Sequence, residues 1–324
     1  MYSKSRLNSF ELENGQVIEK LTVGFHSFGK LNKEKSNVIW VCHALTANSD
    51  VMDWWSGLFG KDKLYDPKKY FIICANSLGS CYGTTGPADS DDSNQPLLDK
   101  FPNITTRDIA RVHDALRRKL QLDAIQVLIG ASQGGQQALE WSILNPNIFI
   151  NLIVLATNAR HSAYGIAFNE SQRLAIYADS TFGSGVDGGR NGLIAARSIA
   201  LLSYRSYLGY EKTQTDQNGD KSSEFNASSY QNHQGQKLAN RFNAYSYVTL
   251  SKAMDSHNVG RWRKSVKDAL QQITAKTLVI GISTDQLFPT IEQKLISINI
   301  PRAEYVEVFS DFGHDGFLIE TEKI

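Results

Sequence analysis

Cysteine is scarce in this sequence, and so are long apolar runs and an excess of charge of either sign. The 3 cysteines are odd in number and do not have metal-ligand spacing: Cys42, Cys74 and Cys81. We therefore expect neither a disulfide framework nor a zinc site. No apolar run approaches the roughly 20 residues that span a bilayer. The polar N-terminus has no signal core, so we expect a soluble, cytoplasmic protein with no membrane partner.

The charges of the chain nearly cancel. Lys and Arg total 34 against 33 for Asp and Glu, which gives a net charge of +1. A protein that binds nucleic acid electrostatically needs a basic excess, so we expect no nucleic-acid partner. With 324 residues, 41% of them hydrophobic, the chain can bury a sizeable core. This length allows one large α/β domain or two small ones.

Short apolar runs in the first half are typical of strands buried on both faces, and hence of a parallel sheet. They are Val38–Cys42, Tyr70–Ala75, Ile125–Gly130 and Leu152–Ala156. Helical spacing occurs over Thr105–Leu120, with Thr106 as a candidate N-cap, and over Gln136–Leu144. This alternation predicts an α/β fold with a doubly wound, mostly parallel sheet.

The strand signals fade after about residue 158 and return late in the chain, at Thr277–Ile282 and Ala303–Phe309. Between them the sequence predicts helices over Asn191–Leu202 and Leu238–Met254, with flexible loops. We therefore expect residues 1–159 and 270–324 to form the core. We expect residues 160–269 to form a helical insertion that acts as a lid.

The sharpest local signal is Gly130-Ala-Ser-Gln-Gly134, a G-x-S-x-G motif between a predicted strand and a predicted helix. In that setting the turn lifts the Ser132 hydroxyl clear of the sheet as a nucleophile, and the Gln133 N–H faces a developing oxyanion. A glycine-rich turn of this kind can also be structural or bind phosphate.

A serine nucleophile needs a histidine base and an orienting carboxylate. In sheets with this motif their chain order is Ser, then Asp or Glu, then His. Asp285 and His314 follow the two late predicted strands in that order. Asp311 and Asp315 also flank His314, but groups so near in sequence rarely orient the ring. The loop after Val38–Cys42 offers a second oxyanion N–H at Leu45, and we expect His43 to hold that loop.

Longer motifs carry a family resemblance over nearly the whole chain. They are His43-Ala-Leu-Thr46, Asn76-Ser-Leu-Gly-Ser-Cys-Tyr-Gly-Thr-Thr-Gly-Pro87, Phe101-Pro-Asn-Ile104, Gly134-Gly-Gln-Gln-Ala-Leu-Glu-Trp141, Gln234-Gly-Gln-Lys237, Arg241-Phe242, Ser246-Tyr247, Ala253-Met-Asp255, Thr284-Asp-Gln-Leu-Phe-Pro289 and Gly313-His-Asp-Gly-Phe-Leu318. With them the chain resembles the homoserine O-acyltransferases of the α/β-hydrolase superfamily.

The resemblance implies an α/β-hydrolase fold with Ser132 as nucleophile, Asp285 as triad acid and His314 as base. It further implies that Arg173, in Ala167-Phe-Asn-Glu-Ser-Gln-Arg173, pairs with the homoserine carboxylate, and that Asp315 holds the amino group. The chain departs from the family pattern at Gln133 and Gln136, where apolar residues usually stand, and this could alter the acyl-group preference.

The activity implied by the resemblance is ping-pong transfer of acetyl from acetyl-CoA to L-homoserine, in methionine biosynthesis. Acetyl-CoA would be a co-substrate, with no bound cofactor and no metal, and the protein would be a homodimer joined through the lid helices. The alternatives are an acyltransferase that uses succinyl-CoA as donor or serine as acceptor, and an ester or thioester hydrolase with the same triad. A catalytically silent binding protein is a further one, against which the three intact triad residues argue.

Overall fold

The main sheet of the computed structural model, which describes residues 1–91 and 93–324, has eight strands in the order β1-β4-β6-β5-β7-β8-β9-β10. Strands β5 to β10 run parallel to one another, whereas β4 pairs antiparallel with β1 and β6. The strands are β1 (Tyr2–Arg6), β4 (Thr22–Phe28), β5 (Val38–Cys42), β6 (Phe71–Ala75), β7 (Ile125–Ala131), β8 (Phe149–Leu155), β9 (Lys276–Ile282) and β10 (Ala303–Val308); β2 (Phe10–Glu11) and β3 (Val17–Ile18) form a separate hairpin. The doubly wound α/β prediction is confirmed.

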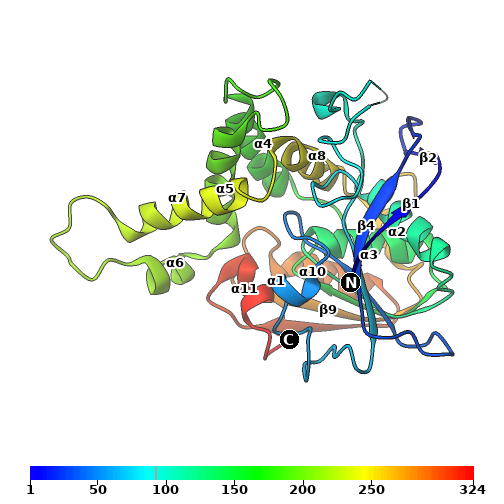
Figure 1. The fold of residues 1–324 in the computed structure, drawn as a ribbon. Helices are drawn as coiled ribbons and strands as arrows, with labels where there is room; N and C mark the ends of the chain where they lie inside the picture. The colour runs from blue at the N-terminus through cyan, green and yellow to red at the C-terminus, as the bar shows by residue number, and fades with distance from the viewer. Residues whose placement is uncertain (92) are drawn as a thin grey trace.

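Helices cover both faces of this sheet (Figure 1). Trp40 of β5 packs into a core cluster with α2 (Thr106–Lys119), α3 (Gln133–Leu144) and α10 (Thr290–Asn299). Its neighbours Ile39 and Val41 pack on the opposite face, in a cluster that includes α1 (Val51–Trp54) and α11 (Gly316–Ile319). Successive strand residues point to opposite faces, so a strand with a helical layer on each side must be apolar throughout.

The N-terminus of α2 corrects one detail of the sequence prediction. Thr105, not Thr106, is the N-cap, and its side chain accepts a hydrogen bond from the Asp108 backbone N–H. The Asp108 carboxylate accepts in turn from the Thr105 N–H, which completes a capping box. Thr106 is buried and donates its hydroxyl to the Ala253 carbonyl. The helix therefore begins one residue earlier than the candidate cap indicated.

Between β8 and β9 the chain is helical, and part of it projects from the body of the molecule (Figure 1). The helices there are α4 (Ala163–Tyr177), α5 (Arg190–Tyr204), α6 (Tyr207–Gln214), α7 (Asn226–Ala239), α8 (Ala244–Asp255) and α9 (Val266–Leu270). The single helix predicted over Leu238–Met254 is wrong, because α7 ends before Asn240 and Asn243 caps a new helix by accepting from the Ser246 N–H.

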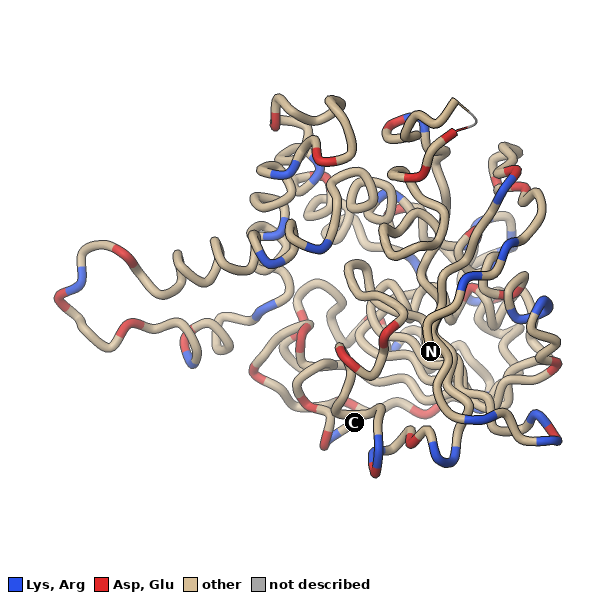
Figure 2. The backbone as a smooth tube through the Cα atoms, in the orientation of Figure 1, with Lys and Arg blue, Asp and Glu red and all other residues tan. Residues whose placement is uncertain are grey.

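Basic and acidic residues are intermixed along the chain, including on the projecting α6–α7 segment (Figure 2). Over residues 1–91 and 93–324, no helix combines the length and the apolar character that a membrane crossing requires. The same residues contain no group of three or more His, Cys, Asp or Glu side chains placed to share a metal ion.

Candidate active site

Ser132 stands at a strained turn between β7 and α3. Its backbone has φ 57° and ψ −128°, a conformation that L-residues avoid and that costs about 1–3 kcal/mol. The flanking glycines make the turn possible: a Cβ on Gly130 would lie 2.2 Å from the Gly134 carbonyl oxygen, and one on Gly134 would lie 2.1 Å from the Cys42 oxygen. Backbone strain kept at a buried residue that lines a cavity is typical of a functional site.

The structure brings Ser132, His314 and Asp285 into one hydrogen-bonded chain. Ser132 Oγ lies 2.9 Å from His314 Nε2, and His314 Nδ1 lies 2.7 Å from Asp285 Oδ2. Asp285 is an acceptor, so Nδ1 carries the ring proton and Nε2 accepts from the serine hydroxyl. This is the arrangement in which a histidine can remove the proton of a serine.

Asp285 is itself held in place by the backbone. Its Oδ1 accepts hydrogen bonds from the N–H groups of Leu287 at 2.9 Å and Phe288 at 2.8 Å. The carboxylate is thereby oriented with only Oδ2 directed to His314. Phe288 also stacks on the His314 ring at 5.0 Å between centroids, so the same loop positions both partners.

The pKa of His314 is set by opposing effects. Burial lowers the pKa, but the charge of Asp285 and its hydrogen bond raise it, as does the charge of Asp315, so the pKa lies above its ordinary value. An imidazolium form that is stabilised in this way strengthens the ring as a proton acceptor.

Leu45 and Gln133 both have unpaired backbone N–H groups within the described part of the chain. Both residues are buried, and Leu45 lines the same cavity as Ser132. Buried N–H groups are nearly always paired, so two unpaired ones near a nucleophile are available to an oxyanion. His43 steadies the Leu45 loop: its Nδ1 lies 2.8 Å from the Ala44 oxygen, and its Nε2 accepts from the Ser77 N–H at 3.0 Å. Burial lowers the pKa of His43 to about 4, so the ring is neutral.

Ser132 and His314 open into a cavity of about 350 Å³ between the sheet and the helical insertion. Six of the lining residues are apolar or small: Ala44, Leu45, Ala47, Trp54, Phe317 and Leu318. The lining also includes charged side chains: Arg197 of α5, Lys237 of α7, Arg241, Asp53 and Asp315. The cavity can therefore receive an uncharged acyl group beside ligand groups of both signs.

Arg173 lies outside this cavity lining. Its guanidinium is buried, with Nη2 2.6 Å from both Asp255 Oδ2 and Glu170 Oε2, and Nη1 donates to Ser251 Oγ at 3.2 Å. Three protein acceptors thus engage this guanidinium. Its predicted contact with a substrate carboxylate stays a prediction.

Arg197, by contrast, lines the cavity and was not singled out from the sequence. It lies over the Tyr204 ring at 5.3 Å, and Tyr204 packs against His314 with ring centroids 5.7 Å apart. A lone arginine within the apolar helix Asn191–Leu202 was a signal that could have found it, since charged residues in such helices generally have a specific partner.

Gln133 and Gln136, the two departures from the family pattern, are both buried and tie the start of α3 to its surroundings. Gln133 Nε2 donates to the Leu250 carbonyl of α8 at 2.9 Å, and Gln136 Nε2 donates to Asn158 Oδ1 at 2.9 Å. Their side-chain carbonyl oxygens have no hydrogen-bond partner among residues 1–91 and 93–324. Neither side chain lines the cavity, so both act behind the nucleophile.

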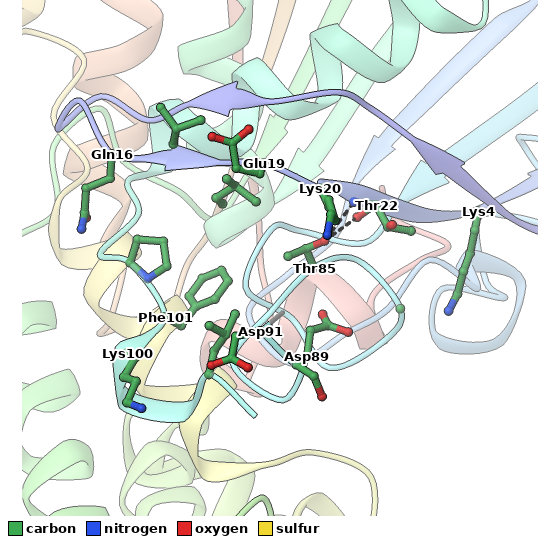
Figure 3. A pocket seen from close by; sticks show the side chains of 16 residues that line it. Lys4, Gln16, Glu19, Lys20, Thr22, Thr85, Asp89, Asp91, Lys100 and Phe101 are labelled. Atoms are coloured by element: carbon green, nitrogen blue, oxygen red, sulfur yellow. Dashed lines mark hydrogen bonds between the residues drawn. The ribbon is translucent and has the colours of Figure 1, made fainter. Parts of the chain in front are cut away.

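A larger hollow of about 560 Å³ lies elsewhere, near the β2–β3 hairpin and the loop that contains Thr85 and Asp89 (Figure 3). Basic and acidic side chains surround it together, among them Lys4, Lys100 and Glu19. None of the predicted site residues lines it. The chemistry of the chain is therefore placed at the smaller cavity with Ser132.

Comparison with known proteins agrees with this architecture. The family model described as "alpha/beta hydrolase fold" matches residues 37–321. A homoserine O-acetyltransferase of Cyclobacterium marinum is 48% identical over 98% of this chain and 90% of its own length. The crystal structure of a homoserine O-acetyltransferase from Bacillus anthracis superposes with a TM-score of 0.90 at 25% identity, covering 99% of this chain and 94% of that one.

Esterase E22, at 22% identity and a TM-score of 0.88 over 100% of this chain and 98% of its own, shares the fold. These matches identify an α/β-hydrolase-fold protein. Within that class, the chain belongs to the homoserine O-acetyltransferase family, because relatives at 38–48% identity cover nearly all of it.

Proposed function

We propose that this protein transfers an acetyl group from acetyl-CoA to the hydroxyl of L-homoserine, through an acyl intermediate on Ser132. The observation that carries the proposal is the Ser132–His314–Asp285 chain opening into a cavity that also presents Arg197 and Asp315. The names of the relatives supply the substrates: they are homoserine O-acetyltransferases over nearly their whole length. The reaction belongs to methionine biosynthesis, and we assign it to the cytoplasm.

In the first half-reaction, His314 Nε2 takes the proton of Ser132 Oγ as the oxygen attacks the thioester carbonyl. The N–H groups of Leu45 and Gln133 bind the oxyanion, and each such donor contributes about 3 kcal/mol in related sites. The intermediate collapses with cleavage of the C–S bond. CoA leaves as the thiol with the proton from His314, and the acetyl group remains as an ester on Ser132.

In the second half-reaction, His314 takes the proton of the acceptor hydroxyl, which attacks the Ser132 ester. The C–O bond to Ser132 breaks, and the proton returns from His314 to Ser132 Oγ. The product is O-acetyl-L-homoserine. Neither half-reaction calls for a bound cofactor or a metal.

Arg197 and Asp315 are the groups that we assign to the two ends of the acceptor. A guanidinium forms paired hydrogen bonds with a carboxylate, and Arg197 is on the cavity wall beside Tyr204 and His314. Asp315 follows His314 in the chain and offers a carboxylate to the ammonium group. The contact of Arg173 with the homoserine carboxylate stays a prediction; in the structure its guanidinium meets Asp255 and Glu170.

A transferase must favour its acceptor over water, and a well-oriented acceptor can reach an effective molarity of about 10⁵ M or more. We propose that residues 160–269 form the lid that supplies this orientation over a core of residues 1–159 and 270–324. The projecting segment carries exposed Tyr207, Leu208 and Phe225. Those apolar side chains support a homodimer formed through the insertion helices.

The test is thiol release from acetyl-CoA by the purified protein, with and without L-homoserine, alongside succinyl-CoA and L-serine. We expect release that depends on homoserine and is fastest with acetyl-CoA. Equal release without any acceptor would assign a hydrolase and refute the transferase. A preference for succinyl-CoA or L-serine would replace the corresponding substrate, and absence of labelling by a serine-reactive phosphonate would indicate a silent protein.

A further inference from the structure

The turn between α5 and α6 packs directly on the loop that carries His314. The Ser206 hydroxyl donates to the Asp311 carbonyl, and Lys212 pairs with the Asp311 carboxylate. Gly313 has φ 66°, and a Cβ there would lie 2.7 Å from the Ser206 N and 2.9 Å from the Arg205 carbonyl carbon. The insertion and this loop are thus in backbone contact, with no space for a side chain between them.

Arg205 adds a contact of another kind, directed at Asp315. Its Nε lies 2.8 Å from Asp315 Oδ2, and both side chains are mostly buried. The N–H is not aligned for a hydrogen bond. Asp315 lines the cavity and Arg205 does not, so the arginine approaches the carboxylate from behind.

The Asp315 carboxylate has no other anchor within residues 1–91 and 93–324: no further hydrogen bond or ion pair to it is seen. Its backbone is fixed in the short turn Gly313–Asp315 and at the start of α11, but its side chain could still rotate. A single contact to Oδ2 leaves Oδ1 free. The carboxylate can therefore be oriented by Arg205 and still accept from a ligand.

We propose that Arg205 is a positioning residue for acceptor recognition, which acts by holding Asp315 in the rotamer that receives the ammonium group. The inference rests on the proposed function, in which Asp315 binds that group. Arg205 does not line the cavity that contains Ser132, so we expect its effect to be confined to the second half-reaction. It also couples the insertion to the acceptor site, because Arg205 directly follows α5.

If Arg205 instead competed with the ammonium group for Asp315, its removal would strengthen homoserine binding and not weaken it. The contact geometry favours positioning, since a competing guanidinium would use its fork to cover both oxygens, whereas here one poorly aligned N–H meets one oxygen. The two readings predict changes of opposite sign in the KM for homoserine when the guanidinium is removed.

The experiment compares the wild-type protein with Arg205→Met, Arg205→Lys and the matched control Lys212→Met. Lys212 lies in the adjacent helix α6 and pairs with Asp311, so the control removes a nearby positive charge without removing the partner of Asp315. Acyl-enzyme formation is followed with p-nitrophenyl acetate in the absence of acceptor. The second half-reaction is followed with L-homoserine and with 4-hydroxybutanoate, which has the same hydroxyl and carboxylate but no ammonium group.

For Arg205→Met we expect the KM for homoserine to rise about tenfold, an effect between those of losing an exposed and a buried ion pair. The rate of acylation should change by less than about twofold. Arg205→Lys should recover part of the loss. Activity toward 4-hydroxybutanoate should be equal in wild type and Arg205→Met, because that acceptor makes no contact with Asp315. Lys212→Met should keep the wild-type KM.

An unchanged or lower KM in Arg205→Met, with an active wild type, would overturn the inference and leave the proposed function standing. A parallel loss in acylation and in transfer would also overturn it, because Arg205 would then hold the His314 loop as a whole. A wild type whose thiol release ignores homoserine would refute the proposed function and this inference together.

Discussion

Replacing Asp285 with asparagine should abolish most of the activity. The reason is a change in the tautomer of His314 and not the loss of a contact. The Asn side chain has the same shape as Asp, but only one of its two polar atoms accepts hydrogen bonds. In the wild type, Oδ1 accepts from the backbone N–H groups of Leu287 and Phe288, and Oδ2 faces His314 Nδ1. The asparagine must choose which of these contacts receives its oxygen.

The backbone decides that choice. Turning the amide nitrogen toward Leu287 and Phe288 would leave two buried N–H groups unpaired, at about 1–3 kcal/mol each. The amide nitrogen therefore faces His314, and Nδ1 must become the acceptor. The ring proton moves to Nε2 and faces Ser132 Oγ. Nε2 can then no longer accept the serine proton.

We expect Asp285→Asn to lower kcat/KM about 10³- to 10⁴-fold, which corresponds to about 4–5.5 kcal/mol of lost transition-state stabilisation. The assay is acyl-enzyme formation with p-nitrophenyl acetate, with the melting temperature as the fold control and Ser132→Ala as the activity blank. A variant that keeps more than about a tenth of the wild-type rate at an unchanged melting temperature would refute this account of the His314 tautomer.

The same variant should shift the pH profile. In the wild type the pKa of His314 is raised, so acylation should increase with pH through an apparent pKa above the ordinary value of 6.5. Without the Asp285 charge, burial lowers the pKa of His314, and the residual activity should persist to lower pH. A profile that keeps the wild-type midpoint in Asp285→Asn would show that Asp285 does not control this pKa.

Three further predictions concern the surroundings of the triad. Arg197→Met should raise the KM for homoserine about 10- to 100-fold, which is the effect of losing a charged hydrogen-bonded pair. The rate of acylation should not change. Steady-state kinetics in which acylation and transfer both slow down would contradict this prediction. Gln133→Leu should leave the free energy of unfolding equal or up to about 1 kcal/mol higher, because it removes an unpaired buried oxygen together with the bond to Leu250; denaturant unfolding that shows a clear loss would argue for an essential tether. The free energy of unfolding should fall as the pH drops from 6.5 to 4, by up to about 3 kcal/mol for each buried neutral histidine. The cause is that these histidines bind protons in the unfolded chain but not in the folded chain. A free energy of unfolding that does not change over this pH range would contradict the assigned pKa values. These histidines are His43, His113 and His161, whose pKa values are lowered by burial to about 4, and His257, whose pKa is lowered to about 3.

Much of the central sheet could be predicted because its strands are buried on both faces. Val38–Cys42 has the predicted bounds, and all five residues are buried. The N-terminal strands β1 and β4 were missed. Residues Tyr2–Arg6 are polar and half exposed, as an antiparallel edge strand allows, so no continuous apolar run marks them.

The helix boundaries depended on local hydrogen bonds that pattern alone did not resolve. Thr105 and Thr106 are both acceptable caps by residue type, and the reciprocal bond with Asp108 decides between them. Asn243 interrupts a segment whose apolar spacing continues on both sides. The capping residues are visible in the sequence. The helical period of apolar residues extends past them, however, so it does not mark where a helix begins or ends.

The sequence by itself determined the identity and the chain order of Ser132, Asp285 and His314. A strained strand–helix turn needs glycines at fixed offsets, and parallel strands deliver their following loops to one edge of the sheet. Only the tertiary structure decided which arginine meets the cavity. Arg173 and Arg197 lie on consecutive helices, and both are plausible partners for a carboxylate. Long-range packing gave Arg173 the carboxylate of Asp255 and left Arg197 beside His314, because side-chain electrostatics depend on neighbours from distant parts of the chain.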